Sequence, residues 1–217
     1  MTPTRKAPVV FPPDPDPLEL MPLHAVPAAL HASLMARLDR LGPAKEIAQI
    51  GATIGRECSY EMLAAVSTLS ERELRASIEQ LTASGLLVGR GTPPDATYLF
   101  KHSLVQDAAY GTLLISSRQR LHARIAEILE TSFPDQAARE PELLARHFAE
   151  AKQSERAVAY WIKAGRHAAE RSANLEAIGH LSRALEALEL LPESEQRDRQ
   201  ELVAQTAIGT PLMRITM

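Results

Sequence analysis

The stretch Tyr98-Leu-Phe-Lys-His-Ser-Leu-Val-Gln-Asp-Ala-Ala-Tyr110 decides the fold, because in it a short apolar strand runs directly into a helix. Tyr98 and Phe100 are two positions apart and therefore point to the same face of the strand. Ser103 followed by Gln106 has the Ser-x-x-Gln spacing of a capping box, which predicts Ser103 as the N-cap. The stretch thus predicts a strand-to-helix junction.

This junction places His102 at the mouth of the helix, beside backbone N–H groups without a helical partner and at the positive end of the dipole. Such a position suits a phosphate. We therefore take His102 and Ser103 as candidate phosphate-sensing residues. The alternative is a structural histidine that packs at the strand end or hydrogen-bonds to a nearby carbonyl, and the residues alone favour it.

The segments before the junction predict helices followed by a β-hairpin. Leucines recur at helical spacing from Ala28 to Leu41, and Gly42-Pro43 ends that helix. Ser59 and Ser70 have the character of N-caps, and Ser70 forms a capping box with Glu73. Three helices and then a hairpin are the order of a winged helix, and one further helix precedes these three. The predicted elements are helices at 28–41, 44–53, 59–66 and 70–84, and strands at 86–88 and 97–101.

The residues after the junction predict helix to the end of the chain, over 103–114, 117–132, 142–151 and beyond. Ala157–Ala164 and Ala177–Ala184 match position for position in side-chain character, apart from two free positions, with small residues at both ends. Small residues let neighbouring helices approach closely. The offset of 20 residues is shorter than the roughly 34 of a tetratricopeptide (TPR) repeat. We therefore expect a TPR-like helical array rather than counted TPR repeats.

Composition supports a mainly α fold, because 45% of the residues are apolar and only 4% are aromatic. A net charge of -3 argues against a protein whose main function is to bind nucleic acid. A single cysteine and no apolar run of about 20 residues predict a cytoplasmic protein with no membrane contact. The predicted domains are a Pro-rich disordered linker at 1–27, a lid remnant and winged helix at 28–115, and the truncated array at 116–217.

Motifs for catalysis are missing from the sequence. It contains no Walker-type phosphate loop, no Gly-x-Ser-x-Gly elbow and no His-Glu-x-x-His zinc motif, so we assign no catalytic residue and no metal ligand. Winged helices often bind DNA with the helix before the hairpin. Here Arg72 and Arg75 on that helix alternate with Glu73 and Glu79, so a solvated mixed-charge face is the expectation.

Two further sets of residues have both a structural and a functional interpretation. The run Arg118, Arg120, His122 and Arg124 alternates along its helix, which indicates a solvated basic surface rather than a binding face. Three ring-bearing side chains of the array are candidates for a partner-binding groove, although a single tryptophan in a helical array is usually a core anchor. They are Tyr160, Trp161 and His180.

Beyond these patterns, residues from Val26 to about Leu191 resemble the region downstream of the nucleotide-binding domain in bacterial signal-transduction ATPases with numerous domains (STAND). The resemblance is greatest to large predicted ATPases that often carry an N-terminal class III adenylate/guanylate cyclase domain. The residues that carry it are Val26-Pro-Ala-Ala-Leu-His, Gly51-Ala-Thr-Ile-Gly-Arg-Glu, Leu81-Thr-Ala-Ser-Gly-Leu-Leu, the stretch Tyr98–Tyr110, and Arg171-Ser-Ala-Asn-Leu-Glu-Ala-Ile.

The resemblance implies the order ATPase core, helical lid, winged helix and TPR-like repeats. In that superfamily a Met-His-Asp-type motif of the winged helix places a histidine against the β-phosphate of bound ADP. Lys101-His102-Ser103 is in the matching place, with lysine before the histidine and serine after it. The resemblance therefore implies ATP or ADP as ligand only together with an ATPase core that this chain lacks.

From the sequence we expect a non-catalytic regulatory and protein-interaction segment of a signal-transduction ATPase. Its partners would be a nucleotide-binding domain, in cis or in trans, and a protein or peptide on the helical array. The alternative is a stand-alone winged-helix DNA-binding transcription regulator, which would require salt-sensitive DNA binding.

Overall fold

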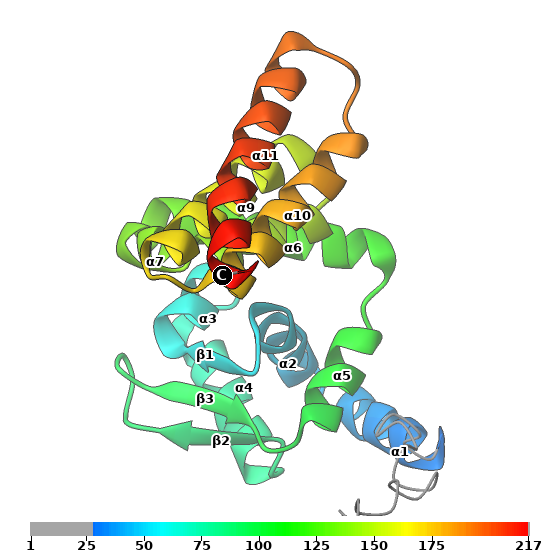
Figure 1. Ribbon diagram of the computed structural model, residues 1–217. Helices are drawn as coiled ribbons and strands as arrows, with labels where there is room; N and C mark the ends of the chain where they lie inside the picture. Colours follow the sequence, from blue (N-terminus) through cyan, green and yellow to red (C-terminus); the bar gives the residue numbers. More distant parts are fainter. Residues whose placement is uncertain (1–27, 217) are drawn as a thin grey trace, which may run out of the picture.

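A computed structural model describes residues 28–216, so the predicted linker at 1–27 lies outside the described residues. The chain is mainly helical with one small three-stranded antiparallel sheet, which confirms the fold class predicted from the sequence. Figure 1 shows the sheet among the helices of the N-terminal half and the last long helices at the opposite end of the molecule. Within 28–216, no helix combines the length and the apolar character needed to cross a bilayer.

The N-terminal half has the connectivity of a winged helix. Its strands lie in the order β1-β3-β2, so that the last strand of the hairpin is the central one. The elements are α1 (Ala28–Asp39), α2 (Pro43–Ile54), β1 (Glu57–Ser59), α3 (Tyr60–Val66), α4 (Glu71–Ala83), β2 (Leu87–Arg90) and β3 (Thr97–Phe100).

Strand β1 was not predicted from the sequence. It has only three residues, too few to show an alternating pattern, and Cys58 pairs with Tyr98 of β3. The hairpin strands are confirmed with small shifts of their bounds.

Two predicted helix starts are confirmed at their caps. The Ser59 hydroxyl accepts a hydrogen bond from the Met62 N–H, at 3.1 Å. Ser70 and Glu73 form the full reciprocal capping box at the start of α4. Since each cap satisfies backbone donors that helix geometry leaves unpaired, these serines fix where α3 and α4 begin.

The predicted cap at Ser103 is wrong. Helix α5 (Ser103–Gly111) has His102 as its N-cap residue and Ser103 as its first helical residue, with no side-chain hydrogen bond at the cap. The Gln106 amide, expected to complete a capping box, instead donates to the Ala52 carbonyl of α2, at 3.3 Å. The Gln106 side chain therefore makes a tertiary contact with α2 instead of the capping contact that its spacing from Ser103 predicts.

The C-terminal half is a succession of helices. Pro134 occupies the first turn of a short helix that was not predicted, in keeping with the preference of proline for that position. The helices are α6 (Ile115–Ser132), α7 (Pro134–Arg139), α8 (Pro141–Glu150), α9 (Ser154–Glu170), α10 (Asn174–Glu189) and α11 (Glu195–Thr216).

The two matching segments lie in α9 and α10, which pack against each other. The alanines at both ends of each segment are buried, and a Cβ built on Gly165 would lie only 2.5 Å from the Leu181 Cγ. The predicted close approach of these helices is thus present. One continuous hydrophobic core joins the winged helix to the helices of the array, from Leu38 to Ala204.

Candidate functional site

His102 lies in the turn that joins β3 to α5, where the sequence predicts it. Its backbone is extended, with φ -138° and ψ 141°, and its side chain is exposed together with those of Lys101 and Ser103. Among the described residues its ring has no hydrogen bond, ion pair or ring contact. The imidazole is therefore open to a group from outside the described chain.

The surroundings of His102 favour an anion. The first turn of α5 contains no acidic residue, so no carboxylate offsets the positive end of the helix dipole. Lys101 adds a positive charge next to it. The two sequence-predicted residues, His102 and Ser103, are thus adjacent at one helix start, although Ser103 does not cap it.

Helix α5 is fixed to the rest of the molecule through its other face. Val105, Ala108 and Ala109 are buried, and Gln106 bonds to α2 as described above. At the far end of the helix the Tyr110 hydroxyl lies 3.0 Å from Nε2 of His122 in α6. The element that carries His102 is therefore anchored to both α2 and α6.

A line of three polar side chains, two of them buried, continues from this contact and was missed by sequence reasoning. Nδ1 of His122 lies 2.8 Å from Nδ1 of His147 in α8, so Tyr110, His122 and His147 connect α5, α6 and α8. His122 is 5% exposed and His147 is fully buried. The expectation that His122 belongs to a solvated basic surface is therefore wrong for this residue. We call these three residues the histidine line.

Burial decides the charge of the histidine line. It lowers the pKa of His122 to about 4, an effect that Arg146 and Arg118 reinforce and Glu150 opposes. Burial, the neighbouring His122 and then Arg146 lower the pKa of His147 to about 3. Both imidazoles are therefore neutral at pH 7, which matches a hydrogen bond in which one Nδ1 donates and the other accepts.

A cavity of about 230 Å³ borders the histidine line, where α2, α5, α6 and α8 meet. Charged residues Asp107, Arg146 and Glu150 line it together with Tyr110 and His122. Among the residues that the structure describes, no group of three or more His, Cys, Asp or Glu side chains is placed to hold a metal ion.

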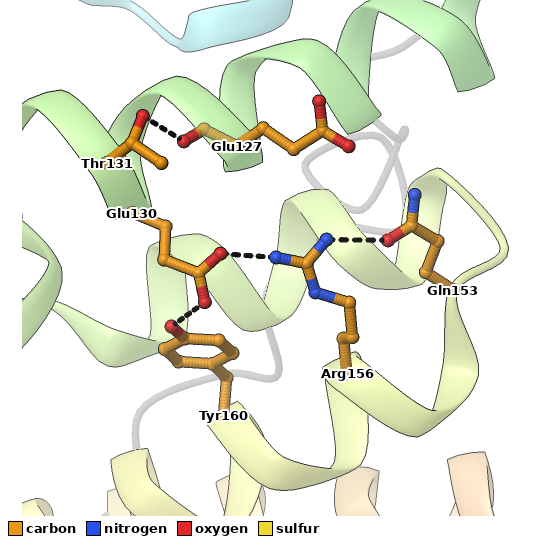
Figure 2. A network of polar contacts seen from close by, with 6 residues as sticks. All are labelled: Glu127, Glu130, Thr131, Gln153, Arg156 and Tyr160. Carbon is orange, nitrogen blue, oxygen red and sulfur yellow. Dashed lines mark hydrogen bonds and ion pairs between the residues drawn. The ribbon is translucent and has the colours of Figure 1, made fainter.

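The three predicted groove residues take different neighbours. The Tyr160 hydroxyl donates to Glu130 of α6 at 2.6 Å, and Glu130 also forms an ion pair with Arg156, as Figure 2 shows. The Tyr160 ring stacks on Phe148 of α8. Burial, and next the hydrogen bond to Glu130, raise the pKa of Tyr160 to about 12. Tyr160 therefore links α9 to α6 and α8.

Trp161 and His180 form a separate contact between α9 and α10. Their rings stack with centroids 5.4 Å apart, and the Arg183 guanidinium lies 5.0 Å from the centre of the indole. Trp161 is only 5% exposed. The structure brings these two rings together, whereas Tyr160 contacts other helices.

The polar face of α4, where a winged helix would contact DNA, has little free positive charge. The helix carries three acidic and two basic side chains. Arg75 donates to Glu71 at 2.7 Å and lies over the Tyr60 ring. Since phosphate binding requires an excess of available Lys and Arg, this face is poorly suited to it.

Comparisons with known proteins give a relative that is much longer than this chain. No protein-family profile matches the chain, and no solved structure matches it. The chain is 30% identical over 187 residues to an uncharacterized protein of Rhizobium meliloti (strain 1021). This match covers 86% of the chain but 18% of the relative, so the chain spans less than a fifth of the length of the protein it resembles.

Proposed function

We propose that this chain is a non-catalytic regulatory and protein-interaction segment that works with a nucleotide-binding ATPase domain, supplied in cis or in trans. The observation that carries the proposal is His102, exposed at the start of α5 with no partner among the described residues. In this proposal its imidazole contacts a phosphate of ADP and favours the nucleotide-bound state.

Three observations support this function. His102 directly follows the hairpin of the winged helix. The resemblance to STAND ATPases implies this position for the histidine that contacts ADP. The start of α5 is free of acidic side chains, which suits a phosphate. The match to a small part of a much longer bacterial protein is consistent with a segment that works beside other domains.

The mechanism is a two-state equilibrium. A phosphate bound by His102 and the first N–H groups of α5 would add free energy only to the state in which the nucleotide-binding domain closes on the winged helix. A protein or peptide bound to the helical array would shift the same equilibrium only if its affinity differs between the two states. The ligand and the partner would thus regulate each other through α5 and the shared core.

The test is the rate of ADP release from this chain joined to a STAND-type nucleotide-binding domain. A hydrogen bond to a charged group contributes about 1.5–3 kcal/mol, so His102→Ala should speed release of a fluorescent ADP analogue roughly 10- to 100-fold. Asp107→Ala on the exposed side of the same helix is the control and should leave the rate unchanged. Equal rates for His102→Ala and the unmodified chain would refute the sensor.

The alternative, a stand-alone DNA-binding regulator, has a simple test. Fluorescence polarisation with duplex DNA at low salt should show no binding that weakens steeply as salt is added. Tight, salt-sensitive binding that is lost in Arg72→Glu would favour the transcription regulator instead.

A further inference from the structure

A second surface, separate from His102, has the features of a docking groove. A cavity of about 500 Å³ opens between α2 and α6, below the turn that joins α5 to α6. Its apolar lining consists of Ile50, Val66, Leu113 and Leu121, and two arginines of α6, Arg120 and Arg124, also line it. We call it the α2–α6 groove.

Apolar side chains next to the groove are unusually exposed. Leu114 and Ile115, in the turn between α5 and α6, are each 74% exposed. A single exposed leucine needs no explanation, but two large apolar neighbours beside an apolar groove are typical of an interaction surface. The occupant should therefore bring apolar side chains.

The charges of the groove indicate an acidic occupant. Arg124 has no ion pair among the described residues, and Arg120 donates only to the Ser117 hydroxyl, at 3.1 Å. Glu46 lies in the first turn of α2, where the positive end of the helix dipole offsets its carboxylate. The two arginines therefore leave unpaired positive charge beside the apolar lining.

One segment of the chain itself combines the required features. Asp14-Pro-Asp-Pro-Leu-Glu-Leu-Met-Pro-Leu23 contains three carboxylates and four large apolar side chains within ten residues. Its prolines at 15, 17 and 22 are incompatible with a helix interior, which favours docking in extended form. This segment ends five residues before Ala28, the first residue of α1, and begins 14 residues before it, so its residues can reach roughly 17 to 46 Å from the start of α1 in extended form.

We propose that residues 14–23 bind in the α2–α6 groove, with their leucines and Met21 on the apolar lining and their carboxylates near Arg120 and Arg124. Because the segment is tethered, its effective concentration at the groove would be of millimolar order, so even a weak site would be occupied. A protein partner with a similar acidic, apolar segment would have to displace it. The N-terminal segment would thus act as an internal competitor for this surface.

Photo-crosslinking of the full chain tests the proposal without any nucleotide-binding domain. A benzophenone amino acid at position 20, in place of Leu20, should crosslink on irradiation to peptides from 46–50 and 113–124, as mapped by mass spectrometry. The yield should not change over a 50-fold dilution, because the contact is within one chain. Crosslinks to other regions, or crosslinks that appear only between two copies, would overturn the proposal.

Charge reversal separates docking from chance proximity. Arg120→Glu with Arg124→Glu should reduce the crosslink at least fivefold, and Asp14→Lys, Asp16→Lys and Glu19→Lys in the same chain should restore it. The matched control is Arg72→Glu with Arg90→Glu, which makes the same change in net charge at exposed positions away from the groove and should have no effect. If the control reduces the yield as much, or the second set of changes does not restore it, the arginines do not hold the segment.

Discussion

Gly165 permits the close contact between α9 and α10, and replacing it with alanine should loosen that contact. The new Cβ would lie 2.5 Å from the Leu181 Cγ and 2.8 Å from its Cδ2. Leu181 is fully buried, so its side chain can shift only against packed neighbours. Overpacking of this kind costs about 1–3 kcal/mol, while the gain in helix propensity is about 1 kcal/mol. We expect Gly165→Ala to lower the free energy of unfolding by up to about 2 kcal/mol.

Gly179 provides the matched control, since it lies in α10 and a Cβ there would meet no atom within 4 Å. Gly179→Ala should therefore raise the free energy of unfolding, by about 0.5–1 kcal/mol. Urea unfolding followed by circular dichroism at 222 nm measures both variants, and their midpoints should move in opposite directions. Combining Gly165→Ala with Leu181→Ala should remove most of the clash. If both single variants stabilise the protein equally, the close approach described for α9 and α10 is incorrect.

The histidine line predicts a pH dependence of stability, and the caps predict a contrast between two serines. Because the pKa values of His122 and His147 are about 4 and 3 in the folded chain against 6.5 without burial, their contribution is complete above pH 6.5 and is lost as the pH falls toward 3. The difference in urea midpoint between the unmodified chain and His122→Gln should therefore shrink on acidification, and a constant difference would contradict the assignment. Ser70→Ala removes a capping box and should cost about 1 kcal/mol, whereas Ser103→Ala removes no cap and should be nearly neutral in the same assay. Equal costs for the two serines would show that Ser103 does cap α5.

Helix starts and the hairpin could be predicted from the sequence because their causes are local. Ser59 and Ser70 each cap through a neighbour three residues away, and the alternation of Tyr98 and Phe100 is visible in four residues. Strand β1 could not be predicted, since it exists through its pairing with β3, about 40 residues later. The nucleotide-sensing role of His102 stays a prediction.

The position of His122 could have been predicted from a pattern that competes with the one we used. It stands three, four and seven residues before Ile125, Ala126 and Leu129, which form the buried stripe of α6. Its arginine neighbours along the chain suggested a surface instead. His147 has a similar cue in buried Leu144, three residues before it, but the contact between the two histidines depends on how α6 and α8 pack.

The two hydrogen bonds of the histidine line can run in either of two donor-to-acceptor orders. If His147 donates to His122 and His122 donates to Tyr110, the tyrosine hydroxyl hydrogen points elsewhere and only an imidazole lone pair at His147 Nε2 lacks a partner; the reverse order leaves an N–H at that atom. A buried N–H without an acceptor is the costlier defect, so the first order is favoured. The Tyr110 hydroxyl then donates its hydrogen to a group that occupies the adjoining cavity. The tautomer of the buried His147 imidazole in α8 therefore reports whether that cavity is occupied.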